Sequence, residues 1–334
     1  MLLIPIYLLS PTLIDLVSSI GYNEIMNSSY PHGRNLFGED AETLRINVYH
    51  DESGTFGCSR WCLTGLLWSK DENERHVVSQ MMQVRETHEY WDEIHYCELP
   101  SYFGGEYSVD ARVARDWLNL YIGNLSSHLW FNVLAVDTHH PTYDAGRFTQ
   151  DFHAYNRFTA ITLYGGLKWH FPDESKLNLA LFSDEKNTRP GGVLGDGITT
   201  DNFEDYVRTR LQADVIQDTR APTIKFESPI KTISIPRKRK KAEIKAEEEM
   251  LQLCDLLVGS VYSAITMSSQ VETKTWLGRT IAQLIVDSRQ KPWEQKLSLH
   301  RRFSVSYFPN SRAEVYSDGH LAIMERQNQP RLFD

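Results

Sequence analysis

The feature that most restricts how this chain folds is an apolar helical run interrupted by one carboxylate. Leucine, valine, cysteine and isoleucine dominate residues 249–265, and Asp255 lies among them. A helix that is hydrophobic on nearly every side is buried. A buried carboxylate without a partner is costly, so Asp255 requires a bound cation or an internal arginine or lysine. The run therefore predicts a central helix with a polar site at Asp255.

A second acidic position follows a short strand near the start of the chain. Asp51 follows the strand-like residues 46–49, and Gly54 ends the pattern. Ligands commonly bind at the carboxyl ends of strands, although an aspartate before Ser-Gly is also an ordinary turn residue. Glu52 would point to the opposite face if the strand continues. We expect only one residue of this pair, Asp51, to contact a bound ligand directly.

Two further aspartates follow hydrophobic strands in the middle of the chain. Asp184 comes after residues 177–182, and Asp137 comes after residues 129–136. Either one can supply the carboxylate of a central strand, and the sequence leaves both open. Magnesium prefers hard oxygen ligands, and a pair of such ions can activate a water and stabilise the leaving oxygen of a phosphodiester. Three carboxylates from two strands and a helix would suit Mg²⁺ or Mn²⁺ and phosphodiester hydrolysis.

The order of the predicted elements favours a mixed α/β sheet covered by helices. A hairpin and a third strand come first, and helices then alternate with strands before the late helix. This order fits a ribonuclease H-like arrangement. The expected strands cover residues 45–51, 60–68, 93–99, 129–136, 177–182, 223–226 and 303–308. The expected helices cover residues 71–87, 109–122, 148–167, 202–213, 249–265 and 275–287.

Size and charge limit the classes of function. The chain has 334 residues and a net charge of −9, which counts weakly against non-specific nucleic-acid binding. No segment reaches the roughly 20 apolar residues of a membrane span, so we expect a cytoplasmic protein without a membrane partner. The four cysteines lack the spacing of a zinc site and are expected to be reduced.

A basic segment precedes the late helix. Residues 229–248 contain a run of arginine and lysine from Arg237 to Lys241, which is typical of a solvated arm and can also contact phosphates. His95 can contact a substrate or move a proton, although a structural histidine is the ordinary alternative. Gln252 lies three residues before Asp255, on nearly the same helix face, and can orient the carboxylate or touch a substrate.

The two acidic motifs together resemble those of a known family. Residues 48–54 and 251–257 are similar to the signatures of the domain-of-unknown-function 3800 family, an aspartate-glutamate-serine-glycine motif and a glutamine-x-x-aspartate motif on a late helix. The resemblance covers about residues 44–265. It implies a ribonuclease H-like fold and a metal-dependent nuclease of prokaryotic mobile or defence systems. The basic insertion at 229–248 departs from the family pattern, as do the extra residues at both ends.

The resemblance carries Asp51 and Asp255 over as the acids, with Glu52 and Gln252 as their motif neighbours and Asp184 as the mid-chain acid. It implies an N-terminal extension at 1–43, a ribonuclease H-like domain at 44–265 and a C-terminal extension at 266–334. We expect hydrolysis of RNA or DNA, with a protein partner in a defence complex. The alternative is an inactive module of the same fold that binds nucleic acid or a partner protein. The expected catalytic residues are Asp51, Glu52, Asp184 and Asp255; the metal ligands are Asp51, Asp184, Asp255 and Asp137; the substrate contacts are Gln252, His95, Arg237, Lys238, Arg239 and Lys240.

Overall fold

A computed structural model describes residues 43–148, 150–172, 176–184, 203–218, 221–267, 269–316 and 319–325. Residues 41–325 form one compact unit. Its strands are β1 Leu44–Ser53, β2 Trp61–Lys70, β3 Leu129–Asp137, β4 Lys176–Asp184, β5 Thr223–Phe226, β6 Lys231–Ile233, β7 Phe303–Phe308, β8 Ser311–Val315 and β9 Leu321–Glu325. Its α-helices are α2 Asp71–His88, α3 Val109–Gly123, α4 Asp151–His170, α5 Phe203–Gln217, α6 Ala246–Thr266, α7 Glu272–Gln290 and α8 Ser298–Arg302.

One mixed sheet organises this unit. Its strand order is β5-β4-β1-β2-β3-β7, and β6 pairs with β4 beyond the end of β5. Strand β2 is antiparallel to β1 and β3, while β4 is parallel to β1 and β7 is parallel to β3. The carboxyl ends of β1 and β4 therefore lie side by side at one edge of the sheet.

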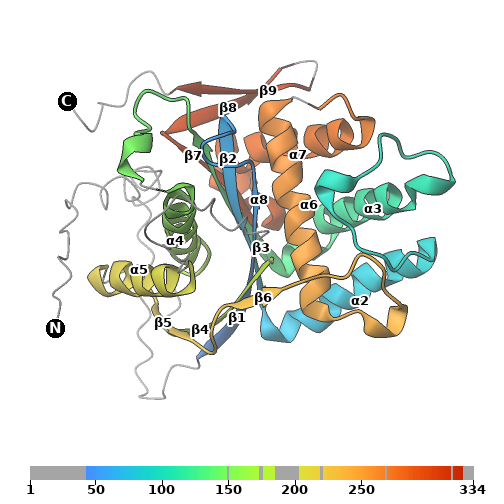
Figure 1. The fold of residues 1–334 in the computed structure, drawn as a ribbon, viewed down its shortest axis with the longest axis horizontal. Coiled ribbons are helices and arrows are strands. Elements are labelled where there is room, and N and C mark those ends of the chain that lie inside the picture. Colours follow the sequence, from blue (N-terminus) through green and yellow to red (C-terminus); the bar gives the residue numbers. More distant parts are fainter. Residues whose placement is uncertain are drawn as a thin grey trace, which may run out of the picture. The chain divides into compact units, whose positions relative to one another are not determined.

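Helices cover both faces of the sheet (Figure 1). Helix α6 lies across β1 and β2, with α2, α3 and α7 on the same side, while α4 and α5 lie on the opposite side. Alternation along the strands explains the division, because successive side chains point to opposite faces. On the α4 side, Thr64 of β2 contacts Thr159 at 3.3 Å between the hydroxyl oxygens.

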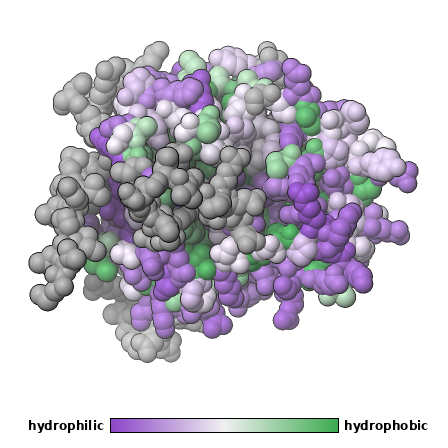
Figure 2. All heavy atoms as spheres, viewed as in Figure 1, coloured by the Kyte–Doolittle hydropathy of each residue, from purple (hydrophilic) through white to green (hydrophobic). Residues whose placement is uncertain are grey.

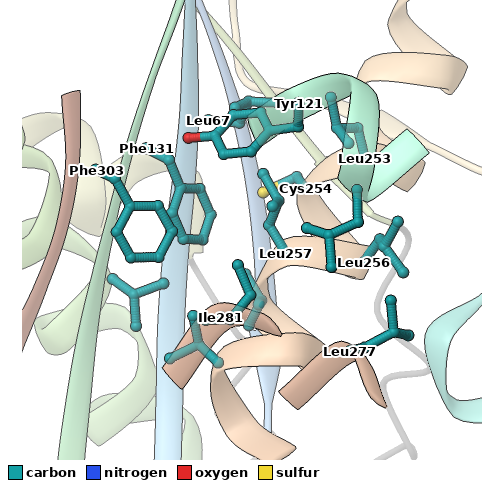
Figure 3. Packing of buried hydrophobic residues seen from close by; sticks show 14 of the residues in the cluster. Leu67, Tyr121, Phe131, Leu253, Cys254, Leu256, Leu257, Leu277, Ile281 and Phe303 are labelled. Carbon is teal, nitrogen blue, oxygen red and sulfur yellow. The ribbon is translucent and has the colours of Figure 1, made fainter. Parts of the chain in front are cut away.

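The main core lies between the sheet and α6. Figure 3 shows Cys254 and Leu257 of α6 beside Leu67 of β2, with Ile281 of α7 below them. The thiol of Cys254 donates to the backbone carbonyl of Tyr49 at 3.2 Å. Burial of this apolar surface is worth roughly 25 cal/mol per Å², so it fixes α6 on the strands that carry the first acidic motif.

The predicted mixed α/β sheet flanked by helices is confirmed, and so is the order of elements expected for a ribonuclease H-like arrangement, with one exception. Residues 93–99 are not the third strand; they form an irregular segment with a 3₁₀ turn at Tyr96–Glu98. The third strand is β3. The alternation in this segment arises because Ile94, Tyr96 and Leu99 are buried, without any strand pairing.

The C-terminal residues share this core. Strand β7 pairs with β3 at the edge of the sheet, and α7 packs against α6. The predicted boundary after residue 265 therefore does not divide two units. The predicted N-terminal extension at 1–43 lies outside the described residues, apart from residue 43.

The face of the described part that is seen in the view of Figure 1 is mostly hydrophilic. Figure 2 shows hydrophilic side chains over most of the described surface on that side, with hydrophobic residues in small groups. No helix among the described residues is long and apolar enough to cross a bilayer. The four cysteines are outside disulfides, with Cys58 and Cys97 exposed and Cys62 and Cys254 buried.

Candidate functional site

Two of the predicted aspartates lie side by side at the edge of the sheet. The parallel pairing of β1 and β4 ends at His50 and Ser183, and Asp51 and Asp184 are the next residues of these strands. Two positions earlier, the rings of Tyr49 and Phe182 stack at 5.0 Å between their centroids. The period of two places both carboxylates on that same face, which α6 covers.

Helix α6 brings the third aspartate to the same place. The carboxylate of Asp255 is in hydrogen-bond contact with that of Asp51 and also accepts the backbone N–H of Tyr96 at 2.7 Å. The side chain of Asp255 is 19% exposed. A small depression of about 10 Å³ opens here, which is room for one water-sized species. Its walls are Asp51, Glu93, Ile94, His95, Asp184, Ile235, Leu251, Gln252 and Asp255.

The electrostatics of this cluster disfavour several negative charges at once. Burial raises the pKa of Asp51 well above its ordinary value, and the carboxylate of Asp255 raises it further. Burial likewise raises the pKa of Asp255, while His95 and the Tyr96 N–H oppose the rise. Paired carboxylates with raised pKa values are typical of functional sites, because a protein rarely assembles them for stability alone.

Glu93 is a site residue that the sequence prediction missed. It lines the same depression, and its pKa is raised by burial and by the nearby carboxylate of Asp184, against the opposing effect of His95. The irregular path of residues 92–96, rather than a strand, turns this side chain toward the aspartates. The signal in the sequence is that Glu93 lies two residues before His95. This spacing points to the site only once residues 93–99 are known to cross α6.

His95 lies at the rim of the depression. Its Nε2 atom is 4.0 Å from a carboxylate oxygen of Asp255, and its side chain is 37% exposed. Its Nδ1 atom is also 3.2 Å from the sulfur of Cys97. The imidazole is therefore within reach of both the carboxylates and the solvent, as the predicted substrate contact requires.

Gln252 holds the segment that carries Glu93 and His95. Its side-chain oxygen accepts the backbone N–H of Ile94 at 2.6 Å and a guanidinium N–H of Arg85 at 3.1 Å. Its amide nitrogen donates to the backbone carbonyl of Glu248 at 3.0 Å. Because the side chain is 2% exposed and its oxygen and nitrogen are both bonded within the protein, Gln252 positions the segment beside the carboxylates; its predicted contact with a substrate stays a prediction.

A buried ionic cluster lies behind Gln252. Arg85 of α2 makes two bonds to the carboxylate of Glu249, at 2.5 Å and 3.1 Å. Arg239 bonds the same carboxylate at 3.1 Å and that of Glu248 at 3.1 Å. Geometry of this kind offsets the desolvation of buried charges. The cluster ties α2, α6 and the basic segment together directly behind the carboxylates.

The basic segment is packed against the protein instead of forming a free arm. Arg239 is 7% exposed and serves the buried cluster, so its guanidinium is turned away from solvent, where the sequence predicts a contact with substrate. Arg237 pairs with Glu98 at 2.5 Å, and Lys238 pairs with Asp92 at 2.5 Å. Both of these side chains stay largely exposed, as does Lys240. Their predicted substrate contacts stay predictions.

Asp137 and Glu52 do not join the site. The carboxylate of Asp137 is held by the guanidinium of Arg60, at 3.2 Å and 3.0 Å. Neither Asp137 nor Glu52 lines the depression. Glu52 follows the alternation of β1 to the α4 side, where its register partner Thr64 contacts Thr159. Asp184, rather than Asp137, is the strand acid beside Asp51.

The donor set of the depression fits a hard divalent cation. Among the described residues, no group of three or more histidine, cysteine, aspartate or glutamate side chains is arranged in metal-binding geometry. The carboxylates that meet here are nonetheless the oxygen ligands that Mg²⁺ and Mn²⁺ prefer. Burial raises the pKa of both Asp51 and Asp255, and the carboxylate of Asp255 raises that of Asp51 further; a bound cation would stabilise the charged form of each carboxylate.

Comparisons with known proteins are sparse for this chain. No family model matches it, and no curated protein matches it. Among solved structures, ribonuclease H2 from Pyrococcus horikoshii OT3 is similar over 77% of this chain and 92% of that chain, with 10% sequence identity and a TM-score of 0.32. The fold described above rests on strand order and direction, independently of this likeness.

Proposed function

We propose that this chain is a divalent-metal-dependent nuclease that hydrolyses phosphodiester bonds of RNA or DNA. The observation that carries the proposal is the meeting of Asp51, Asp184 and Asp255, from β1, β4 and α6, in one small depression. These residues lie 133 and 71 positions apart along the chain, so only the fold brings them together. Glu93 adds a fourth carboxylate.

Asp51, Asp184 and Asp255 would hold Mg²⁺ or Mn²⁺, with Glu93 as a further oxygen donor. When bound, such an ion lowers the pKa of a bound water and neutralises charge on a phosphodiester. His95, exposed at the rim, would donate a proton to the leaving oxygen. Gln252 and the N–H of Tyr96 keep this segment and Asp255 in place, which matters because small displacements of reacting groups are costly.

A cleavage assay on the full chain tests the proposal. Labelled single- and double-stranded RNA and DNA are incubated with Mg²⁺, with Mn²⁺ or with a chelator. We expect cleavage only with metal, and a loss of at least about 100-fold in Asp51→Asn and in Asp255→Asn, since each removes a metal ligand.

The matched control is Asp137→Asn, which removes the same charge from the end of a neighbouring strand but lies outside the depression. It should retain most of the wild-type activity, and circular dichroism establishes that all three variants fold. Chelator-resistant cleavage, or full activity in Asp51→Asn, would contradict a metal-dependent nuclease. Strand binding without cleavage under every metal condition would instead favour the inactive-module alternative.

Membership of the domain-of-unknown-function 3800 family stays a prediction from the two sequence motifs, as does a defence role with a protein partner. Both depend on the same acids, so loss of activity in the aspartate variants would support the motif assignment. The choice between RNA and DNA follows from the same assay.

A further inference from the structure

A second cavity adjoins the carboxylate depression. Its volume is about 350 Å³, within the range of small-ligand sites, which begins near 300 Å³. It lies between two segments of the chain. One is strand β6 together with Ser234, and the other is the start of helix α6 together with Lys245. Its lining residues are Lys231, Thr232, Ile233, Ser234, Lys245, Glu247 and Glu248.

The cavity and the depression are lined by neighbouring residues of the same two segments, residues 231–235 and helix α6. On the β6 side, Ile233 lines the cavity and is the register partner of Asp184, while Ile235 lines the depression two residues later. On the helix side, Glu248 lines the cavity and Gln252, one turn further along α6, lines the depression. Seven residues separate Glu248 from Asp255, about 10 Å at the rise of an α-helix. A polymer that occupies one therefore reaches the other.

Charge in the cavity favours an anion. Glu248 is held by Arg239 at 3.1 Å, which offsets its charge from behind. Lys245 lies 3.3 Å from the same carboxylate and is 65% exposed, and Lys231 is also exposed. Glu247 is the one remaining acid in the lining of the cavity, so the two lysines give the lining a net positive charge. Thr232 and Ser234 add hydroxyl groups, which commonly contact phosphate oxygens.

We propose that this cavity binds the phosphodiester backbone of the strand whose adjacent phosphate lies over the carboxylates. The inference rests on the proposed nuclease function and extends it. Lys231 and Lys245 contact backbone phosphates, and the strand continues along α6 to Asp255. The cations that this cavity offers to the strand are Lys231 of β6 and Lys245, the residue before α6.

Binding is measured apart from cleavage. The full chain is titrated into a labelled single-stranded RNA and the matching DNA in a chelator, by fluorescence anisotropy at several salt concentrations. In the Lys231→Ala/Lys245→Ala double variant we expect weaker binding and a salt slope smaller by about 1.4, because each phosphate contact on a single strand contributes about 0.7. The Lys231→Arg/Lys245→Arg variant keeps both charges and should keep the wild-type slope.

The matched control is Lys176→Ala/Lys225→Ala, which removes the same charge near the opposite end of the sheet. Lys176 is eight residues from Asp184 on β4, about 26 Å away at the rise of a strand. We expect its salt slope to equal that of the wild type. Equal slopes in the two double-alanine variants, or absence of strand binding by the wild type, would overturn the backbone site. The cleavage assay fails or succeeds separately, because binding in a chelator requires no catalysis.

Discussion

At the scale of single residues, partners decide what an aspartate at a strand end does. Asp51 and Asp137 both follow buried strands, and the sequence around them is similar in kind. Asp137 meets Arg60 and becomes half of an ion pair. Asp51 meets Asp255 and keeps a raised pKa. Because the partner comes from a distant part of the chain in each case, the local pattern predicted an acid at a strand end but not its role.

The burial of His170 makes the stability of the protein depend on pH. It ends α4, and its two ring nitrogens are buried without hydrogen-bond partners within the described part of the chain. Its ring lies edge-on to Trp68 at 6.4 Å between centroids. Burial lowers the pKa of His170 to about 3. The folded protein therefore holds this histidine neutral at pH values where the unfolded chain protonates it.

We predict that His170 makes the protein less stable as the pH falls. The unfolded pKa of histidine is about 6.5, so between that value and the folded pKa the unfolded chain binds more protons, and the free energy of unfolding decreases with falling pH. His170→Phe removes this contribution. Urea unfolding from neutral to mildly acidic pH should show a shallower decrease in His170→Phe than in the wild type. His139→Asn, at an exposed position, should follow the wild type; identical slopes in all three proteins would refute the prediction.

At the scale of elements, close approach between helices and the sheet depends on particular glycines. In α4, a Cβ atom on Gly166 would lie 2.5 Å from the Trp68 side chain and 2.7 Å from that of Asn132, whereas one on Gly165 would meet nothing within 4 Å. Trp68 and Asn132 are themselves joined by a hydrogen bond of 2.6 Å. The two adjacent glycines therefore have opposite surroundings on one helix.

We predict that Gly166→Ala destabilises the protein by about 1–3 kcal/mol, because the added methyl group overpacks the contact between α4 and the sheet. Gly165→Ala should instead be neutral or stabilise the protein by up to about 1 kcal/mol, since alanine is the better helix former. Chemical denaturation of both variants measures the difference. A Gly166→Ala protein as stable as Gly165→Ala would show that α4 is not held against Trp68.

Elements with strong periodicity were predictable from the sequence. Strands β5 and β7 have the predicted bounds, and α6 extends the predicted range by a few residues. The segment at 93–99 was mistaken for a strand, because buried side chains alternate along it without a pairing partner. The sequence does not single out Glu93 as a site residue, nor the burial of Arg239, for a related reason: the long-range contacts that fix them leave no periodic signal in the sequence.

At the scale of the whole molecule, the central sheet is completed by residues far along the chain. Strand β7 extends it beyond β3, and α7 covers α6, with Leu277 and Ile281 fully buried. The resemblance to a family ends near residue 265; the sequence predicts a helix and a strand beyond it, but not that they join the same core. Packing supplies that reason, because the apolar surface of α6 needs a cover.

We predict that a fragment ending at residue 265 does not fold cooperatively, because it exposes the face of α6 that α7 covers and leaves β3 as an unpaired edge. A fragment of residues 41–325 should unfold in a single transition. Thermal unfolding followed by circular dichroism distinguishes the two fragments. A sharp transition in the shorter fragment would show that the C-terminal residues are an independent addition.

The wide separation of the site acids along the chain also has a consequence for synthesis. Asp51 and Glu93 leave the ribosome early, but Asp255 follows more than two hundred residues after Asp51, on the helix that closes the depression. A growing chain therefore holds an incomplete set of acids until α6 has emerged and packed. The proposed metal site therefore cannot be complete before most of the chain has been synthesised.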